Sequence, residues 1–170
     1  LPIIAEDLGF ITDEVRELRN TFNLPGMKIL QFAFAADARN PYLPHNYDRN
    51  VVVYTGTHDN NTTIGWYESL EEGKKSFAQT YLGPVDEGIH WALIRLAYRS
   101  IANTAVIPLQ DVLGLGSDAR MNTPAEASGN WSWRFCREDI KPEHIEKLKT
   151  MAVTYRRAEP DERQEMPEYM

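Results

Sequence analysis

Acidic side chains follow short apolar runs at three places in this sequence. Glu6 and Asp7 come first, Asp59 stands beside His58 in the middle of the chain, and Asp111 comes last. If the apolar runs are neighbouring strands, their carboxylates converge on one pocket. Such a group suits glycoside chemistry, in which one acid protonates a leaving oxygen and other carboxylates stabilise an oxocarbenium-like centre.

The loops around these acids also hold the side chains that a sugar site uses. Aromatic rings stack on pyranose faces, and amides hydrogen-bond to hydroxyls. The candidates are Phe34, Tyr42, Tyr47, Tyr54, Trp66, Trp131 and Trp133 for stacking and Asn46, Asn60, Asn61, Asn122 and Asn130 for hydroxyls. A structural reading stays open for each group, because the first acid pair can cap a helix, the "HDNN" stretch can be a turn, and a tryptophan can anchor the core.

Four short apolar runs are expected to form the strands that position these residues. They are Pro2–Ala5, Met27–Phe34, Val51–Tyr54 and Ala105–Leu109, and they do not alternate with polar residues. That pattern is typical of strands covered on both faces of a parallel sheet. We expect helices at 12–22, 86–102 and 142–157, a loop at 35–50, and mostly irregular structure at 110–140.

The order of these elements predicts an α/β fold of a particular kind. In a (β/α)8 TIM barrel the carboxyl ends of the strands carry the chemistry, but such a barrel needs eight strands and about 250 residues. A chain of 170 residues with about four strands amounts to half a barrel. We therefore predict a single partial domain over 1–170, from a longer protein cut at its N-terminus.

Composition excludes several classes of partner. The net charge is −7 with pI ≈ 5.1 and no basic stripe, which argues against nucleic acid and against anionic membrane surfaces. No apolar run approaches the roughly 20 residues of a membrane span. Cys136 is the single cysteine, so no internal disulfide is expected, and the four histidines lack metal-ligand spacing. Neither a metal nor an organic cofactor is predicted.

Several long motifs occur together and in order. They read "IIAEDLGFIT", "LPGMKILQFAF", "PHNYDRNVVVYTGTHDNNTT" and "RMNTPAEASGNWSWR". Together they resemble the C-terminal half of the catalytic barrel of the 4-α-glucanotransferases, glycoside hydrolase family 77. The resemblance implies barrel strands five to eight, a closing helix at 142–157, and retaining transfer of α-1,4-glucan segments between maltooligosaccharides or to glucose.

The resemblance also assigns roles to individual residues. Glu6 matches the general acid/base, and Asp59 matches the carboxylate that grips sugar hydroxyls and stabilises the transition state. His58 and Asn122 match groups that contact the bound glucan, and Phe34 matches an aromatic near the cleavage site. The nucleophilic aspartate of the family belongs to barrel strand four, and its motif does not occur in this sequence.

Two differences from the family, the missing nucleophile and Asn61, determine what we expect of the isolated chain. Without the nucleophile the isolated chain is expected to be inactive or nearly so, and an open half-barrel is expected to self-associate or to need its missing N-terminal half. Asn61 stands where the family often has an acid, so a supporting role is expected for it. The alternatives are an α-amylase-like hydrolase and a non-catalytic glucan-binding half-barrel. The expected location is the cytoplasm, or the plastid stroma in a plant.

Overall fold

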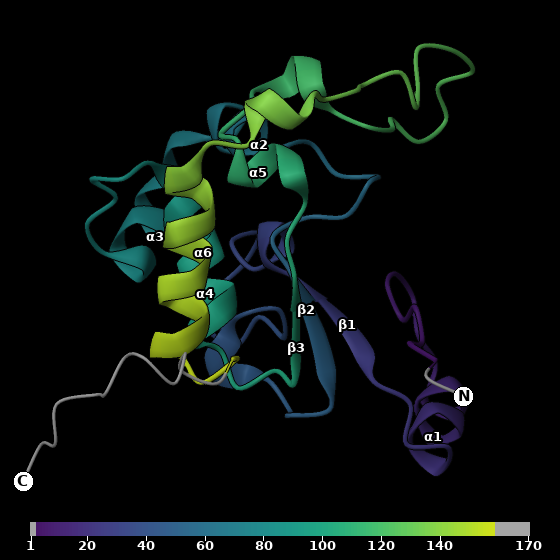
Figure 1. The fold of residues 1–170 in the computed structure, drawn as a ribbon. Coiled ribbons are helices and arrows are strands. Elements are labelled where there is room, and N and C mark those ends of the chain that lie inside the picture. Colours follow the sequence, from purple (N-terminus) through teal and green to yellow (C-terminus); the bar gives the residue numbers. More distant parts are fainter. Residues whose placement is uncertain (1–2, 159–170) are drawn as a thin grey trace, which may run out of the picture. The chain divides into compact units, whose positions relative to one another are not determined.

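The computed structural model describes residues 3–158, and the chain divides into two compact units between Arg134 and Phe135. The first unit is an α/β arrangement around a parallel sheet of three strands in the order β1-β2-β3. Their bounds are Gly26–Ile29, Val51–Tyr54 and Thr104–Val106. Met27 pairs with Val52, and Val52 pairs in turn with Thr104, so the three carboxyl ends lie at one edge of the sheet (Figure 1).

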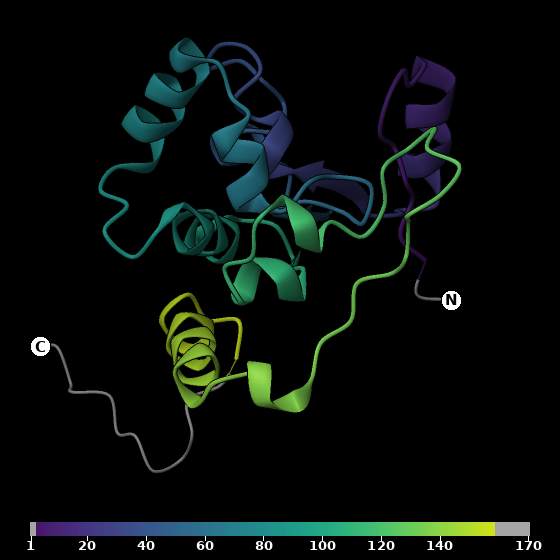
Figure 2. The ribbon, with the colours of Figure 1, turned by 90° about the horizontal axis from the view of Figure 1, so that it is seen from above.

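Helices of the first unit accompany this sheet. They are α1 (Asp13–Thr21), α2 (Thr63–Glu68), α3 (Glu72–Leu82), α4 (Ile89–Arg99) and α5 (Leu109–Val112). Helix α4 packs against α2, α3 and α5, and its buried Leu93 and Leu96 join Val51 and Val53 of β2 in one hydrophobic core. Figures 1 and 2 show α2, α3 and α4 gathered on one side, whereas α1 lies beyond β1.

The expected strand Val51–Tyr54 is confirmed as β2 with the same bounds. The other expected strands are shorter or missing, and the first of the four is not formed in residues 3–5; Pro2 lies outside the described residues. Ala5 does reach the sheet, because its amide donates to the Pro25 carbonyl at 2.9 Å just before β1. The expected strand over 27–34 ends at Ile29, where a 3-10 helix begins. The expected strand over 105–109 ends at Val106, because Pro108 cannot donate to a ladder and instead precedes α5.

The expected helices occur with similar corrections. The helix at 86–102 is α4, which begins only at Ile89 because Gly88 has φ 95, a left-handed conformation that a helix cannot use. It ends at Arg99, so Ile101, which falls within the expected range 86–102, lies outside the helix and is 48% exposed. The stretch 110–140 is less irregular than predicted, since it includes most of α5 and two short 3-10 helices.

Helix α1 begins after Thr12 as predicted, but it buries none of its residues. Its apolar side chains Val15, Leu18 and the following Phe22 are 47%, 58% and 66% exposed. The second unit consists, over 135–158, of a 3-10 helix at Arg137–Asp139 and of α6. Helix α6 begins at Pro142, as expected from proline's preference for the first helical turn, and ends at Thr154 rather than near 157.

Candidate active site

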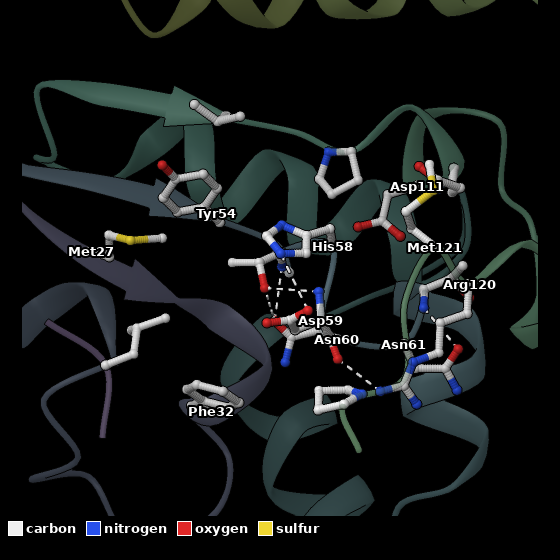
Figure 3. Close-up of a pocket in the computed structure, with 18 of the residues that line it drawn as sticks. Met27, Phe32, Tyr54, His58, Asp59, Asn60, Asn61, Asp111, Arg120 and Met121 are labelled. Carbon is white, nitrogen blue, oxygen red and sulfur yellow. Dashed lines mark hydrogen bonds and ion pairs between the residues drawn. The ribbon is translucent and has the colours of Figure 1, made fainter. Parts of the chain in front are cut away.

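A large open cavity lies at the carboxyl ends of the three strands, within the first unit. Its volume is about 1310 Å³, above the usual range for small-molecule pockets, so it has room for an extended ligand. It is lined by Glu6, Leu8 and Gly9, by Met27 and Phe32, by residues 54 and 56–62, by 106–108 with 110 and 111, and by Arg120, Met121, Pro124 and Trp131. Figure 3 shows this lining, with His58 and Asp59 beside each other.

The β2–α2 loop, residues 55–62, contributes more of the lining than any other segment. A tight turn shapes it: the amide and the hydroxyl of Thr57 both donate to Oδ1 of Asn60, at 2.8 and 2.9 Å, and the Asn60 amide donates back to the Thr57 carbonyl at 3.1 Å. His58 and Asp59 form the tip of this turn, with side chains 57% and 50% exposed. The side-chain amide of Asn60 therefore stabilises the shape of the loop, and the loop presents the imidazole of His58 and the carboxylate of Asp59.

The segment Arg120-Met121-Asn122, called here the 120–122 segment, forms hydrogen bonds with the residues at that tip. The side-chain amide of Asn122 donates to Oδ1 of Asp59 at 2.6 Å, and the Asn122 backbone amide donates to the His58 carbonyl at 3.0 Å. Arg120 donates from Nη2 to the Asp59 carbonyl at 2.7 Å and from Nε to the Asn122 carbonyl at 2.9 Å. His58 Nε2 also lies 3.2 Å from Oδ1 of Asp59. This oxygen thus meets two partners.

Trp131 adds an aromatic surface next to the imidazole. Its ring centroid lies 5.2 Å from that of His58 with the planes inclined by 37°, and the side chain is 54% exposed at the cavity. Its backbone has φ 61 and donates to the Met121 carbonyl at 2.7 Å. A non-glycine residue held in this conformation, with an exposed indole, is typical of a binding surface rather than of a core anchor.

The two acids of the "AED" stretch take different positions. Glu6 is exposed and lines the cavity, with Oε1 accepting from the Leu8 amide at 2.9 Å. Asp7 instead accepts from the Met27 amide at 2.7 Å and pairs with Arg19 of α1. Asp7 is thus a structural residue, although it does not cap a helix: it ties α1 to the start of β1.

Asp111 reaches the same edge of the sheet but is only 2% exposed. Its Oδ2 accepts from the hydroxyls of Thr55 and Thr63 at 2.5 and 2.8 Å, and its Oδ1 accepts from the Thr63 amide at 2.7 Å. Burial raises the pKa of this carboxyl above its ordinary value, and the three hydrogen bonds oppose that rise.

Phe34 does not fit the role that the sequence suggested. It is 1% exposed and packs against Trp66, Phe77 and Tyr81 in the core, and it does not line the cavity. Phe32 lies on the cavity instead. The 3-10 turn after Ile29 is the reason, because residues two apart share a face only in a strand.

The remaining candidates stand as follows. Asn60 and Asn61 line the cavity, whereas Asn122 reaches the site through its bonds to His58 and Asp59. The side-chain amide of Asn61 donates to the Ser117 hydroxyl at 3.0 Å, and the backbone carbonyl of Asn61 accepts from Gln31 at 2.8 Å. Sequence reasoning missed Arg120 and Gln31, because each acts on a backbone carbonyl far away in the chain.

This arrangement combines exposed carboxylates, an imidazole, amides and an indole around an open cavity, which are the groups that bind and cleave sugars. Residues 1–139 match the model of glycoside hydrolase family 77, described as 4-alpha-glucanotransferase. The chain belongs to this family. The sequence-based identification is thereby confirmed.

Relatives and a solved structure agree with the family match. The chain is 61% identical over 137 residues to a 4-alpha-glucanotransferase from Synechocystis sp., covering 79% of this chain and 27% of the relative. It is 52% identical over 160 residues to one from Thermus thermophilus, covering 89% and 32%. It superposes on an amylomaltase from Streptococcus agalactiae in complex with acarbose with TM-score 0.89 and 37% identity, covering 92% and 32%. The chain therefore spans about a third or less of their length.

Within residues 3–158, none of the helices is long and apolar enough to cross a membrane. Within the same range, no three histidine, cysteine, aspartate or glutamate side chains gather where they could hold a metal ion.

Proposed function

We propose that this chain forms the C-terminal half, about strands five to eight, of the (β/α)8 barrel of a 4-α-glucanotransferase. The whole enzyme transfers α-1,4-glucan segments between maltooligosaccharides or to glucose by a retaining mechanism. The observation that carries the proposal is the tip of the β2–α2 loop, where Asp59 is oriented by Asn122 and flanked by His58 at the mouth of a cavity that Glu6 also lines.

In this proposal Glu6 is the general acid/base. It protonates the departing sugar in the first half-reaction and deprotonates the acceptor hydroxyl in the second. Asp59 binds sugar hydroxyls and stabilises positive charge at the anomeric centre, with His58, Asn60 and Asn122 as its neighbours at the bound ring. The nucleophile comes from the N-terminal half of the barrel, which is the partner that this chain requires.

The exposed apolar face of α1 supports the need for that partner, because a stable helix normally buries such a face. Without it we expect the isolated chain to self-associate, and light scattering that reports a monomer at all concentrations argues against this picture.

We place the whole enzyme in the cytoplasm or, in a plant, in the plastid stroma. Among the relatives, the one from Arabidopsis thaliana is named as chloroplastic/amyloplastic.

A chimera tests the function directly. This chain replaces the region of the Thermus thermophilus enzyme that it matches, and the product is given maltotriose. We expect redistribution of chain lengths with release of glucose, whereas the free 170-residue chain is expected to be inactive. Immediate formation of reducing ends without longer chains indicates the alternative, a hydrolase. Binding of maltooligosaccharides without turnover indicates a non-catalytic glucan-binding half-barrel.

The acid/base assignment has its own test in the same chimera. Glu6→Gln is expected to abolish transfer and to leave maltooligosaccharide binding largely intact, because the amide keeps the shape of the side chain but can act neither as an acid nor as a base. The matched control is Glu72→Gln on the exposed surface of α3, which should keep full activity. Full transfer by the Glu6 variant refutes the assignment.

A further inference from the structure

The β2–α2 loop leaves and re-enters the fold at two buried threonines. Thr55 follows the last residue of β2, Thr63 is the first residue of α2, and both are 0% exposed. Between them the loop projects towards the cavity and carries His58 and Asp59. Whatever fixes these two threonines to each other therefore fixes the base of the loop.

Asp111 is the side chain that joins them. One carboxylate oxygen accepts from both threonine hydroxyls, and the other accepts from the amide of Thr63. That amide is at the first turn of α2, where the helix itself offers no acceptor. Three donors from two points of the chain thus meet one acceptor-only group of fixed shape.

We propose that Asp111 is a positioning residue of the active site, which clamps Thr55 to Thr63 and thereby holds His58 and Asp59 at the cavity. The inference rests on the proposed function, since it names a residue that serves the same site. Asp111 is not a catalytic residue itself, because it is 2% exposed and its oxygens are engaged by the threonines.

The cost of burying a carboxylate argues for such a role. Removing this charge from water is unfavourable, and an apolar side chain of similar size would pack at the same place without that cost. What an apolar side chain cannot do is accept three hydrogen bonds in fixed directions. The carboxylate therefore contributes geometry, and the geometry that it sets is that of the loop.

Gln31 shares part of this task, because its backbone amide donates to the Thr55 carbonyl at 3.3 Å and its side chain donates to the Asn61 carbonyl at 2.8 Å. Asp111 differs from Gln31 in that it also bonds to Thr63, at the start of α2. The 120–122 segment bonds to the tip of the loop, but it is itself a connection without helix or strand. At the base, the bonds to Asp111 link the end of a buried strand to the start of a helix, the two rigid elements available.

Valine and serine substitutions at Thr55 separate positioning from packing. Thr55→Val keeps the branched shape and loses the hydroxyl, whereas Thr55→Ser keeps the hydroxyl and loses the methyl group. If Asp111 positions the loop, the valine variant is impaired and the serine variant is close to the parent. If Thr55, Thr63 and Asp111 only fill space in the core, the serine variant is instead the more impaired of the two. The same pair can be made at Thr63, whose hydroxyl bonds to the same oxygen.

The first measurement uses the 170-residue chain and needs no activity. Amide hydrogen exchange is followed at residues 56–62, with Leu93 and Ile94 of α4 as the internal reference. We expect Asp111→Asn and Thr55→Val to speed exchange in the loop by about tenfold while α4 is unchanged, which is local opening. Asp86→Asn, the same change at an exposed turn, is the control.

The second measurement is transfer by the chimera. Displacing Asp59 by about 1 Å costs on the order of 10²-fold in turnover. We therefore expect Asp111→Asn and Thr55→Val to lower kcat per folded enzyme by about 10²-fold and about tenfold, with little change in KM. Thr55→Ser should restore kcat to near the parent value.

The outcomes separate the two proposals. Loop exchange that is unchanged in Asp111→Asn, or faster in Thr55→Ser than in Thr55→Val, overturns the positioning role whatever the chimera does. Faster exchange together with an unchanged kcat shows that the clamp does not serve catalysis, and this also overturns it. An inactive parent chimera rejects the proposed function, while the exchange comparison still decides whether Asp111 holds the loop.

Discussion

Removing the Asp111 carboxylate should destabilise the fold by more than any single hydrogen bond would suggest. In Asp111→Ala the Thr63 amide loses its acceptor and cannot turn to another, because its direction is fixed by the start of α2. The hydroxyls of Thr55 and Thr63 also lose theirs, but they can rotate. All three donors belong to residues that are 0% exposed, so each of them loses a buried acceptor.

The magnitude follows from these contacts. An orphaned buried amide costs about 2 kcal/mol, and each rotating hydroxyl about 1 kcal/mol. The variant no longer buries a charge, which offsets part of that sum, so the net loss in the free energy of unfolding is about 3 kcal/mol. With a urea dependence of about 2 kcal/mol per molar, the midpoint of unfolding moves down by about 1.5 M.

Urea unfolding of the 170-residue chain, followed by tryptophan fluorescence, measures this shift. Asp86→Asn is again the control and should stay within about 0.5 kcal/mol of the parent, as is usual for exposed positions. A loss of less than about 1 kcal/mol in Asp111→Ala refutes the reasoning, because it means that the three donors find other partners at no cost.

Three further outcomes are expected. Burial raises the pKa of Asp111 above its unfolded value, so proton binding at Asp111 stabilises the fold at low pH and this stabilisation is lost as pH rises. In urea unfolding, the stability of the parent relative to Asp111→Asn should therefore fall from about pH 4 upward. An increase in that relative stability with pH contradicts the prediction. Asn122→Ala removes the 2.6 Å bond to Asp59 and should lower kcat/KM of the chimera about tenfold, whereas unchanged kinetics mean that the bond does not orient the carboxylate. Trp131→Ala should raise KM for maltotriose several-fold more than Trp131→Phe, which keeps an aromatic face; equal values in both variants exclude stacking as the cause.

The sequence was sufficient for the class of fold and for the part of the site that is contiguous. Unbroken apolar runs predicted parallel strands, and polar residues behind them predicted one shared edge, which the β2–α2 loop and Asp111 both occupy. His58 and Asp59 lie together because they are neighbours in the chain. The bond from Asn122 to Asp59 could not be predicted, because nothing in the spacing indicates a contact between residues 63 positions apart. The family resemblance indicated Asn122 only as a contact of the bound glucan.

One error arose where tertiary contacts ended an element early. The apolar run 27–34 continues past Ile29, but the chain turns there and buries Gln31 so that it reaches the Asn61 carbonyl. That turn moves Phe34 into the core and leaves Phe32 on the cavity. No local pattern distinguishes these two phenylalanines, since both belong to the same apolar run.

Carboxylate side chains that are close to one another in this fold differ in exposure and in their partners. Glu6 and Asp7 are adjacent, yet Glu6 is exposed at the cavity and Asp7 receives an amide and a guanidinium. Asp59 and Asp111 repeat the division, one half-exposed at the tip of a loop and the other buried at its base. Exposure of the carboxylate, more than its place behind a strand, therefore separates the acids proposed to act on a sugar from those that hold the fold in position.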